Sequence, residues 1–157
     1  MNDFDKKEFE LALELFEVED YETCFEIIKP LAEKNIDKAI VFLAGCYFSG
    51  TGVEKDLKEA LRLYLKAAFL GNAEAMKTVA ICYEKGIGVE LNNQEAVRWY
   101  KESANRGDRD AQFTLAKMYH QGDRIDPDCH NAIELYKKAA ANGHKEAAAA
   151  LKKLELY

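Results

Sequence analysis

The chain has 157 residues, of which 48% are apolar, so it is long enough and apolar enough to form the hydrophobic core of one domain. Its formal net charge is −6 and is unevenly placed, because residues 1–26 hold ten acids and two bases while residues 27–157 hold 18 acids and 20 bases. An acidic N-terminal region on a nearly neutral body excludes general binding to nucleic acid, which requires clustered Lys and Arg.

The N-terminal residues MNDFDKKEFE include no apolar segment of the kind found in a secretory leader. The sequence also contains no apolar run of about 18 residues, the length that a membrane-spanning helix requires. We therefore expect a cytoplasmic protein that does not contact a membrane. A periplasmic location would apply only if a leader had been removed.

Residues 39–147 follow a pattern with a period of 36 residues. The residues that recur at equivalent positions are Ala39, Ala75, Ala111 and Ala147; Tyr47, Tyr83 and Tyr119; Gly50, Gly86 and Gly122; Ala60, Ala96 and Ala132; Tyr64, Tyr100 and Tyr136; and Gly71, Gly107 and Gly143. A fixed period between about 20 and 50 residues is typical of stacked-repeat proteins. The pattern predicts a single solenoid over residues 1–157, with full repeats at 37–72, 73–108 and 109–144.

Each full repeat is predicted to contain two helices. In the first repeat, the apolar residues of 38–49 have the spacing of one helical face, and Gly50 ends this helix because glycine adopts left-handed backbone angles without strain. The second helix begins at Asp56, which forms the capping-box pattern D-x-x-E with Glu59. Trp99 falls on the buried face of the second helix in the next repeat, so we expect it to pack in the core.

The recurring string A-x-x-x-L-A-x-x-Y-x-x-G-x-G-V-x-x-D-x-x-x-A-x-x-x-Y-x-K-A-A-x-x-G resembles the Sel-one-like repeat, a relative of the tetratricopeptide repeat. The resemblance covers Ala39–Gly143 in three copies. It implies an all-α fold, a right-handed superhelix (solenoid) of helical hairpins with about nine helices. It also implies a concave face that is generally used for contact between proteins.

The two ends are predicted to be altered copies of the repeat that cap the solenoid. Residues 1–36 would form an N-terminal hairpin, with helices near 4–16 and 20–34 and a loop that is shorter than in the full repeats and lacks glycine. Residues 145–157 would form one C-terminal helix with Lys152, Lys153 and Glu155 on its outer side. Because the ends of a solenoid face water, both caps are expected to present polar outer faces.

The third repeat departs from the pattern in its loop, where Arg124 replaces the second glycine and Pro127 precedes Asp128. A residue other than glycine in left-handed geometry costs about 1 kcal/mol or more. We therefore expect the loop at residues 122–128 to adopt a different backbone shape. Retained left-handed geometry would instead indicate that the strain serves another purpose.

The cysteines are predicted to be reduced thiols. Cys46 and Cys82 occupy equivalent positions in stacked helices, whose axes lie about 8–10 Å apart, whereas a disulfide requires Cα atoms within about 7 Å. Cys129 and His130 lack the spacing of a zinc site, and adjacent helical residues point about 100° apart, which disfavours a Cys–His nucleophile pair. His144 is expected to be exposed in a turn. We predict no catalytic residue, no metal and no cofactor, and therefore no enzyme.

In the tetratricopeptide arrangement, the first helix of each repeat lines the concave face. The residues predicted to contact a partner there are Phe9, Leu13 and Phe16; Val41, Gly45 and Phe48; Lys77, Ile81 and Lys85; and Phe113, Lys117 and His120. This surface is apolar in its N-terminal half and charged or polar toward the C-terminus. Packing between helices is the alternative role for Phe9, Val41 and Phe113. A glycine within a helix costs about 1 kcal/mol against alanine, and Gly45 would leave a hollow beside Phe48.

Two main classes of function fit this surface. The first is an adaptor that binds a protein, as a peptide or a helix, through apolar anchors while lysines fix the register. The second is an immunity protein that inhibits one toxic enzyme, with the acidic region from Asp3 to Glu26 contacting a basic nuclease. A hydrolase is the third class. We expect a monomer or a weak homodimer.

Overall fold

The computed structural model describes residues 2–154. This part of the chain contains nine helices and no strand: α1 (Asp3–Glu17), α2 (Tyr21–Glu33), α3 (Asp37–Ser49), α4 (Leu57–Phe69), α5 (Ala73–Lys85), α6 (Asn93–Asn105), α7 (Arg109–Gln121), α8 (Cys129–Ala141) and α9 (Lys145–Leu154). Each helix packs against the one before it and the one after it. The prediction of an all-α solenoid of helical hairpins is confirmed.

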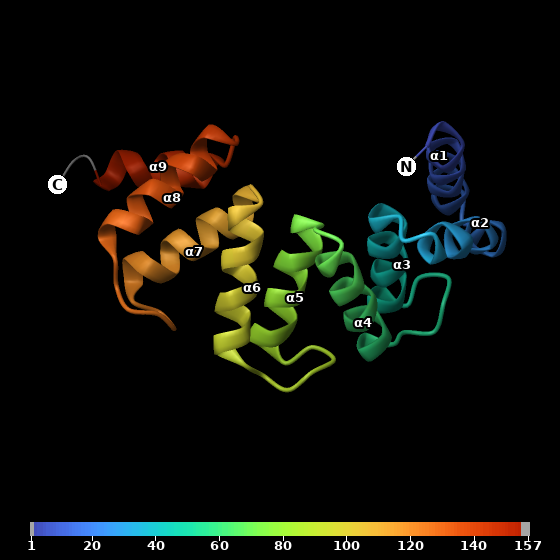
Figure 1. The fold of residues 1–157 in the computed structure, drawn as a ribbon, viewed down its shortest axis with the longest axis horizontal. Coiled ribbons are helices and arrows are strands. Elements are labelled where there is room, and N and C mark those ends of the chain that lie inside the picture. Colours follow the sequence, from blue (N-terminus) through green and yellow to red (C-terminus); the bar gives the residue numbers. More distant parts are fainter. Residues whose placement is uncertain (1, 155–157) are drawn as a thin grey trace.

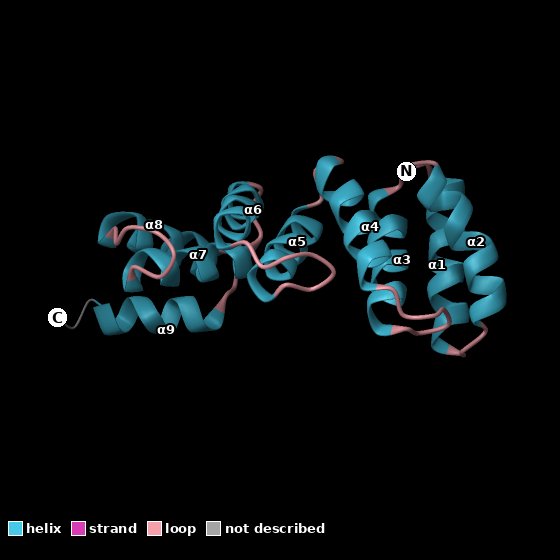
Figure 2. Cartoon of the chain, turned by 90° about the horizontal axis from the view of Figure 1, so that it is seen from below, coloured by secondary structure: helices cyan, strands magenta, loops and turns pink. Residues whose placement is uncertain are grey.

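The hairpins follow one another along an arc whose two ends rise on the same side (Figure 1). The long loops between α3 and α4, α5 and α6, and α7 and α8 lie on the opposite side of the arc. Figure 2 shows α1 and α2 side by side at the N-terminal end, and α9 without a second helix of its own at the C-terminal end. The chain therefore has two distinct ends joined by three similar hairpins.

The starts of the second helices are fixed by polar N-caps. Asp56 Oδ1 accepts hydrogen bonds from the backbone N–H groups of Lys58 and Glu59, both at 3.0 Å. The second half of the predicted capping box is absent, because the Glu59 carboxylate binds Arg62 at 2.6 Å and the Asp56 N–H donates to the Tyr47 carbonyl at 3.0 Å. Equivalent loop hydrogen bonds join Asn92 to Tyr83 and Asp128 to Tyr119. A carbonyl near the end of the first helix of each hairpin thus takes the place of the glutamate.

The loop of the third repeat keeps its left-handed geometry, so the expectation of a different backbone shape is wrong. Arg124 has a φ of 66°. Its Nη1 lies 3.1 Å from Glu84 Oε1 and 2.6 Å from Asp123 Oδ2, and its Nε donates to Asn93 Oδ1 at 3.2 Å. The Tyr100 hydroxyl donates to the other Glu84 oxygen at 2.9 Å. These contacts bind the loop to α5 and α6 and offset the backbone strain.

Alanines occupy the closest contacts between helices, while larger side chains fill the space between them. The fully buried alanines are Ala12, Ala39, Ala44, Ala67, Ala75, Ala80, Ala96, Ala111, Ala116, Ala132, Ala139 and Ala147. Trp99 is only 7% exposed, which confirms its place in the core. Its ring meets the ring of Phe69 edge to face at 5.6 Å. One apolar cluster runs from α1 to α7, and a second joins α7, α8 and α9.

The two ends differ in the surfaces they expose. On α9, Lys152 and Lys153 are exposed, as predicted, whereas Glu155 lies outside the described residues. At α1, Phe4, Leu11 and the C-cap residue Val18 are 64%, 47% and 73% exposed. The N-terminal end therefore exposes apolar side chains among charged ones such as Lys7, Glu10 and Glu14.

Candidate functional site

The twelve predicted contact residues lie on α1, α3, α5 and α7, the first helices of successive hairpins. Four of them are exposed: Phe48, Lys85, Lys117 and His120. The other eight are partly buried: Phe9, Leu13, Phe16, Val41, Gly45, Lys77, Ile81 and Phe113. All twelve keep some contact with water, but their neighbours divide them into three groups.

The first group, on α1, packs against α3. The rings of Phe9 and Phe16 both meet the ring of Phe42 edge to face, with centroids 6.4 Å and 4.9 Å away. Phe16 also contacts Tyr21, at 5.2 Å. These rings therefore hold the N-terminal hairpin onto the first full repeat, and only part of each ring remains open to a partner. The 36-residue pattern could not show this, because Phe42 has no aromatic counterpart in the later repeats.

The second group, on α3 and α5, combines an exposed aromatic residue with unfilled space. Phe48 is 36% exposed. A methyl group added at Gly45 would contact only the Tyr64 hydroxyl, 3.7 Å away. Ile81, which occupies the position of Gly45 in the next repeat, is partly buried. A side chain from another molecule could rest against Phe48 here without displacing a residue of the chain.

Lys77 is held by two acids at the start of α7, Asp108 and Asp110. Its Nζ lies 2.9 Å from Asp110 Oδ2 and 3.3 Å from Asp108 Oδ2, and its side chain is only 20% exposed. Burial alone would lower the pKa of Lys77, but the hydrogen bond to Asp110 and the charge of Asp108 raise it. The same hydrogen bond lowers the pKa of Asp110. This charge therefore links α5 to α7, a contact 33 residues apart in sequence.

The third group, on α7, consists of Phe113, Lys117 and His120. The Phe113 ring stacks on His144 at 4.2 Å and meets Tyr136 at 5.8 Å. Lys117 Nζ lies 5.8 Å from the centre of the same ring, and the His120 ring lies 6.4 Å from Tyr136. The C-terminal part of the predicted surface thus consists of one enclosed aromatic ring covered by polar groups.

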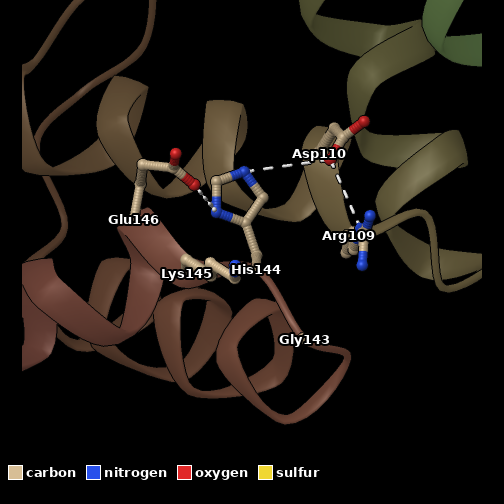
Figure 3. Close-up of a pocket in the computed structure, with 6 residues that line it drawn as sticks. All are labelled: Arg109, Asp110, Gly143, His144, Lys145 and Glu146. Atoms are coloured by element: carbon tan, nitrogen blue, oxygen red, sulfur yellow. Dashed lines mark ion pairs between the residues drawn. The ribbon is translucent and has the colours of Figure 1, made fainter.

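His144 lies beside a polar cavity of about 240 Å³ (Figure 3). The cavity is lined by Arg109, Asp110, Gly143, His144, Lys145 and Glu146. The prediction that His144 is exposed is wrong, because its side chain is only 11% exposed. Its Nδ1 accepts from the Ala147 N–H at 3.2 Å and lies 3.3 Å from Glu146, while its Nε2 lies 3.8 Å from Asp110.

The 36-residue period of the sequence indicates that His144 caps the start of α9. His144 stands 36 residues after Asp108 and 72 after Asn72. Both of these residues cap the helices that follow them, by accepting from Ala111 and Ala75. His144 therefore supplies the equivalent hydrogen bond at the start of α9, and the polar cavity is part of the joint between α7 and α9.

Two features absent from residues 2–154 bear on the class of site. These residues contain no cluster of three or more His, Cys, Asp or Glu side chains placed to hold a metal ion. None of their helices combines the length and the apolar character needed to cross a membrane. All four cysteines are free thiols, of which Cys24, Cys46 and Cys82 are buried and Cys129 is exposed.

We expect only Cys129 to react quickly with iodoacetamide in the folded protein. Burial raises the pKa of Cys46 and of Cys82 to about 11, so at pH 8 roughly a thousandth of each would be thiolate, the reactive form. Mass spectrometry should show one fast modification per chain, and Cys129→Ala should remove it. A second fast modification would show that one of the buried thiols is accessible in the folded state.

The chain matches the Sel1 repeat family at residues 37–72, 73–108 and 109–144. No curated protein matches it by sequence. Among solved structures, it is 29% identical to a Sel1 repeat protein from Oxalobacter formigenes, with a TM-score of 0.85 over 91% of this chain and 59% of that one. It is 28% identical to c5321, a protective antigen of uropathogenic Escherichia coli with an SLR fold, with a TM-score of 0.84 over 91% of this chain and 32% of that one.

The chain thus spans 59% and 32% of the lengths of these two structures. The immunity protein Pa5087 from Pseudomonas aeruginosa, 20% identical with a TM-score of 0.50 over 94% of this chain and 69% of that one, is similar in fold alone. The family match covers more than half of the sequence and coincides with the hairpins α3–α4, α5–α6 and α7–α8. This chain therefore belongs to the Sel1 repeat family.

Proposed function

We propose that this chain is a non-catalytic adaptor that binds a peptide or a partner helix on its concave face. Sel1 repeat proteins are generally protein-interaction modules, and the fold is typically a non-catalytic scaffold. The observation that carries the proposal is on α3, where Phe48 is exposed and Gly45 leaves space beside Tyr64. An exposed aromatic ring next to unfilled space is the usual form of an anchor pocket in a protein interface.

Exposed lysines on the later helices of the predicted surface support a directional mode of binding. Lys85 on α5 and Lys117 on α7 are exposed. Lys77 is already neutralised by Asp108 and Asp110, so it contributes to the rigidity of the face rather than to binding. We therefore propose that Lys85 and Lys117 fix the register of the ligand along the face. They would pair with acids of the ligand that lie next to its apolar anchors.

Affinity capture from the native cell, followed by mass spectrometry, tests the proposal. We expect Phe48→Ala and Ile81→Glu each to reduce capture of the main partner about tenfold or more, the usual effect at an interface hot spot. Leu91→Ala is the matched control, because Leu91 is 59% exposed in the α5–α6 loop and is not one of the predicted contact residues. Undiminished capture by both variants, with unchanged circular dichroism, would contradict the proposal.

The charge of the N-terminal hairpin favours a second candidate, an immunity protein that neutralises a basic enzyme. Asp5 is unavailable for this role, because it is 7% exposed and pairs with Lys34 at 2.8 Å. Glu22 and Glu26 on α2 are exposed. If this candidate is correct, reversing both charges to lysine should abolish capture of the enzyme while Phe48→Ala leaves it intact. The adaptor proposal predicts the opposite pair of results.

A further inference from the structure

An apolar stripe runs along the outer side of α1. Phe4, Leu11 and Val18 are 64%, 47% and 73% exposed, and they are spaced seven residues apart. Seven residues are close to two helical turns, so the three side chains lie on one line along the helix axis and its C-terminal end. We refer to these three residues as the α1 stripe.

The α1 stripe is separate from the face by which α1 joins the solenoid. Ala12 is fully buried, and Phe9 and Phe16 pack on Phe42 of α3. On a helical projection with 100° per residue, Phe9, Ala12 and Phe16 lie about 100° to 160° from Leu11. The stripe therefore lies on the side of α1 away from α3, although Lys34 Nζ lies 5.9 Å from the centre of the Phe4 ring. The helix itself is at the N-terminal end of the arc (Figure 1). A solenoid end ordinarily carries a polar face, because it has no neighbour to bury it.

We propose that the α1 stripe binds the α1 stripe of a second copy of this chain, with the two helices antiparallel and the two-fold axis at Leu11. Phe4 and Val18 are each seven residues from Leu11, or about 10.5 Å along the axis on either side. In this arrangement Leu11 faces Leu11 of the second copy, and Phe4 faces Val18 of the second copy. The stripe is thus complementary to itself, as an isologous interface requires.

The charges beside the stripe select this orientation. Lys7 and Glu14 are both exposed and lie on the same flank, about 40° and 60° from Leu11. They are about 6.0 Å and 4.5 Å from Leu11 along the axis, in opposite directions. The two-fold operation therefore places Lys7 beside Glu14 of the second copy, twice. In a parallel pair related by a two-fold axis, each Lys7 and its copy would lie on opposite flanks of the contact, so neither Lys7–Glu14 pair would form.

Two features make this association reversible. One helix from each copy buries less than the roughly 800 Å² per partner of a standard stable interface. The N-terminal region also holds ten acids against two bases, so two copies repel each other at distances within the screening length. The dimer should therefore form at high concentration, and Phe48 and Ile81, the proposed anchors of the concave face, lie on helices outside the contact.

Sedimentation of the full chain from micromolar to millimolar concentration tests the proposal. We expect a reversible monomer–dimer equilibrium that Leu11→Lys abolishes. Lys7→Glu and Glu14→Lys should each raise the dimer Kd about tenfold, and the double variant that carries both changes should restore it to within about twofold. The two single changes alter the net charge in opposite directions, so a loss shared by both cannot arise from overall repulsion.

Glu22→Lys provides the control for charge, because it makes the same change as Glu14→Lys at an exposed position on α2. It should not weaken the dimer. Circular dichroism of every variant should match the wild type, since Lys7, Leu11 and Glu14 are all exposed. A wild-type monomer at millimolar concentration, a dimer that survives Leu11→Lys, or a double variant that does not recover would each overturn the proposal, leaving a helix of another protein as the occupant of the stripe.

Discussion

Replacement of Gly88 by alanine is expected to destabilise the protein by about 2–5 kcal/mol. Gly88 has a φ of 71°, and a side chain in this left-handed region costs about 1–2 kcal/mol. The added methyl carbon would also lie 2.8 Å from the carbonyl carbon of Leu57, with the carbonyl oxygen closer still. Because the obstacle is backbone in the first turn of α4, relief requires a shift of the helix, and overpacking of this kind costs about 1–3 kcal/mol more.

Gly107→Ala separates the two contributions. Gly107 has a φ of 93°, and a methyl group there would meet nothing within 4 Å. Its loss of stability should therefore be the conformational cost alone, about 1–2 kcal/mol. Urea unfolding followed by circular dichroism measures both variants. Equal losses for the two would show that the loop moves away from α4 without cost.

The contact that makes Gly88 sensitive recurs in different chemical forms along the chain. A methyl group at Gly52, the equivalent position in the first repeat, would lie 2.7 Å from the Tyr21 ring in the first turn of α2. At the third such position, Arg124 binds the side chain of Asn93 in the first turn of α6. Each loop therefore rests on the second helix of the preceding hairpin. In two repeats the loop approaches closely through glycine, and in the third it reaches across with a guanidinium group.

This recurrence explains why the fold could be predicted from the sequence and why the third loop could not. A period of 36 residues reports what each repeat shares, namely helix faces, N-caps and the glycines of the turns. The strain at Arg124 is offset by Glu84 and Asn93, which belong to the preceding repeat. A pattern within one repeat does not show which side chains of its neighbour come within reach.

The candidate binding surface, too, could be predicted only in part from the sequence. The helices that carry it follow from the period, but the neutralisation of Lys77 depends in part on Asp110, which belongs to the next repeat. The exposure of the α1 stripe could not be predicted from the sequence, for another reason. A seven-residue spacing marks an apolar line on a helix without showing whether another helix covers it. Burial is a property of the assembled solenoid, and α1 stands at its end.

Replacement of Trp99 by alanine should cause a loss of about 3–5 kcal/mol, the range for removing a large aromatic side chain from a core. Trp99 is 7% exposed, and it occupies the position held by Leu63 in the previous repeat. Its ring meets Phe69 of α4 at 5.6 Å. The residue therefore belongs to the contact between the first and second full repeats, near the middle of the apolar cluster that runs from α1 to α7.

Phe69→Ala is the matched control for this substitution, because Phe69 forms the other half of the aromatic pair but is 77% exposed. It should cost about 0.5–1.5 kcal/mol, the value of the edge-to-face contact. Circular dichroism must report the unfolding, since Trp99 is the only tryptophan. In a solenoid, stability is a sum of repeats and of the interfaces between them, so Trp99→Ala should also broaden the transition by weakening one interface. A sharp transition with a loss no larger than that of Phe69→Ala would mean that the stacked alanines, rather than the aromatic residues, hold these two repeats together.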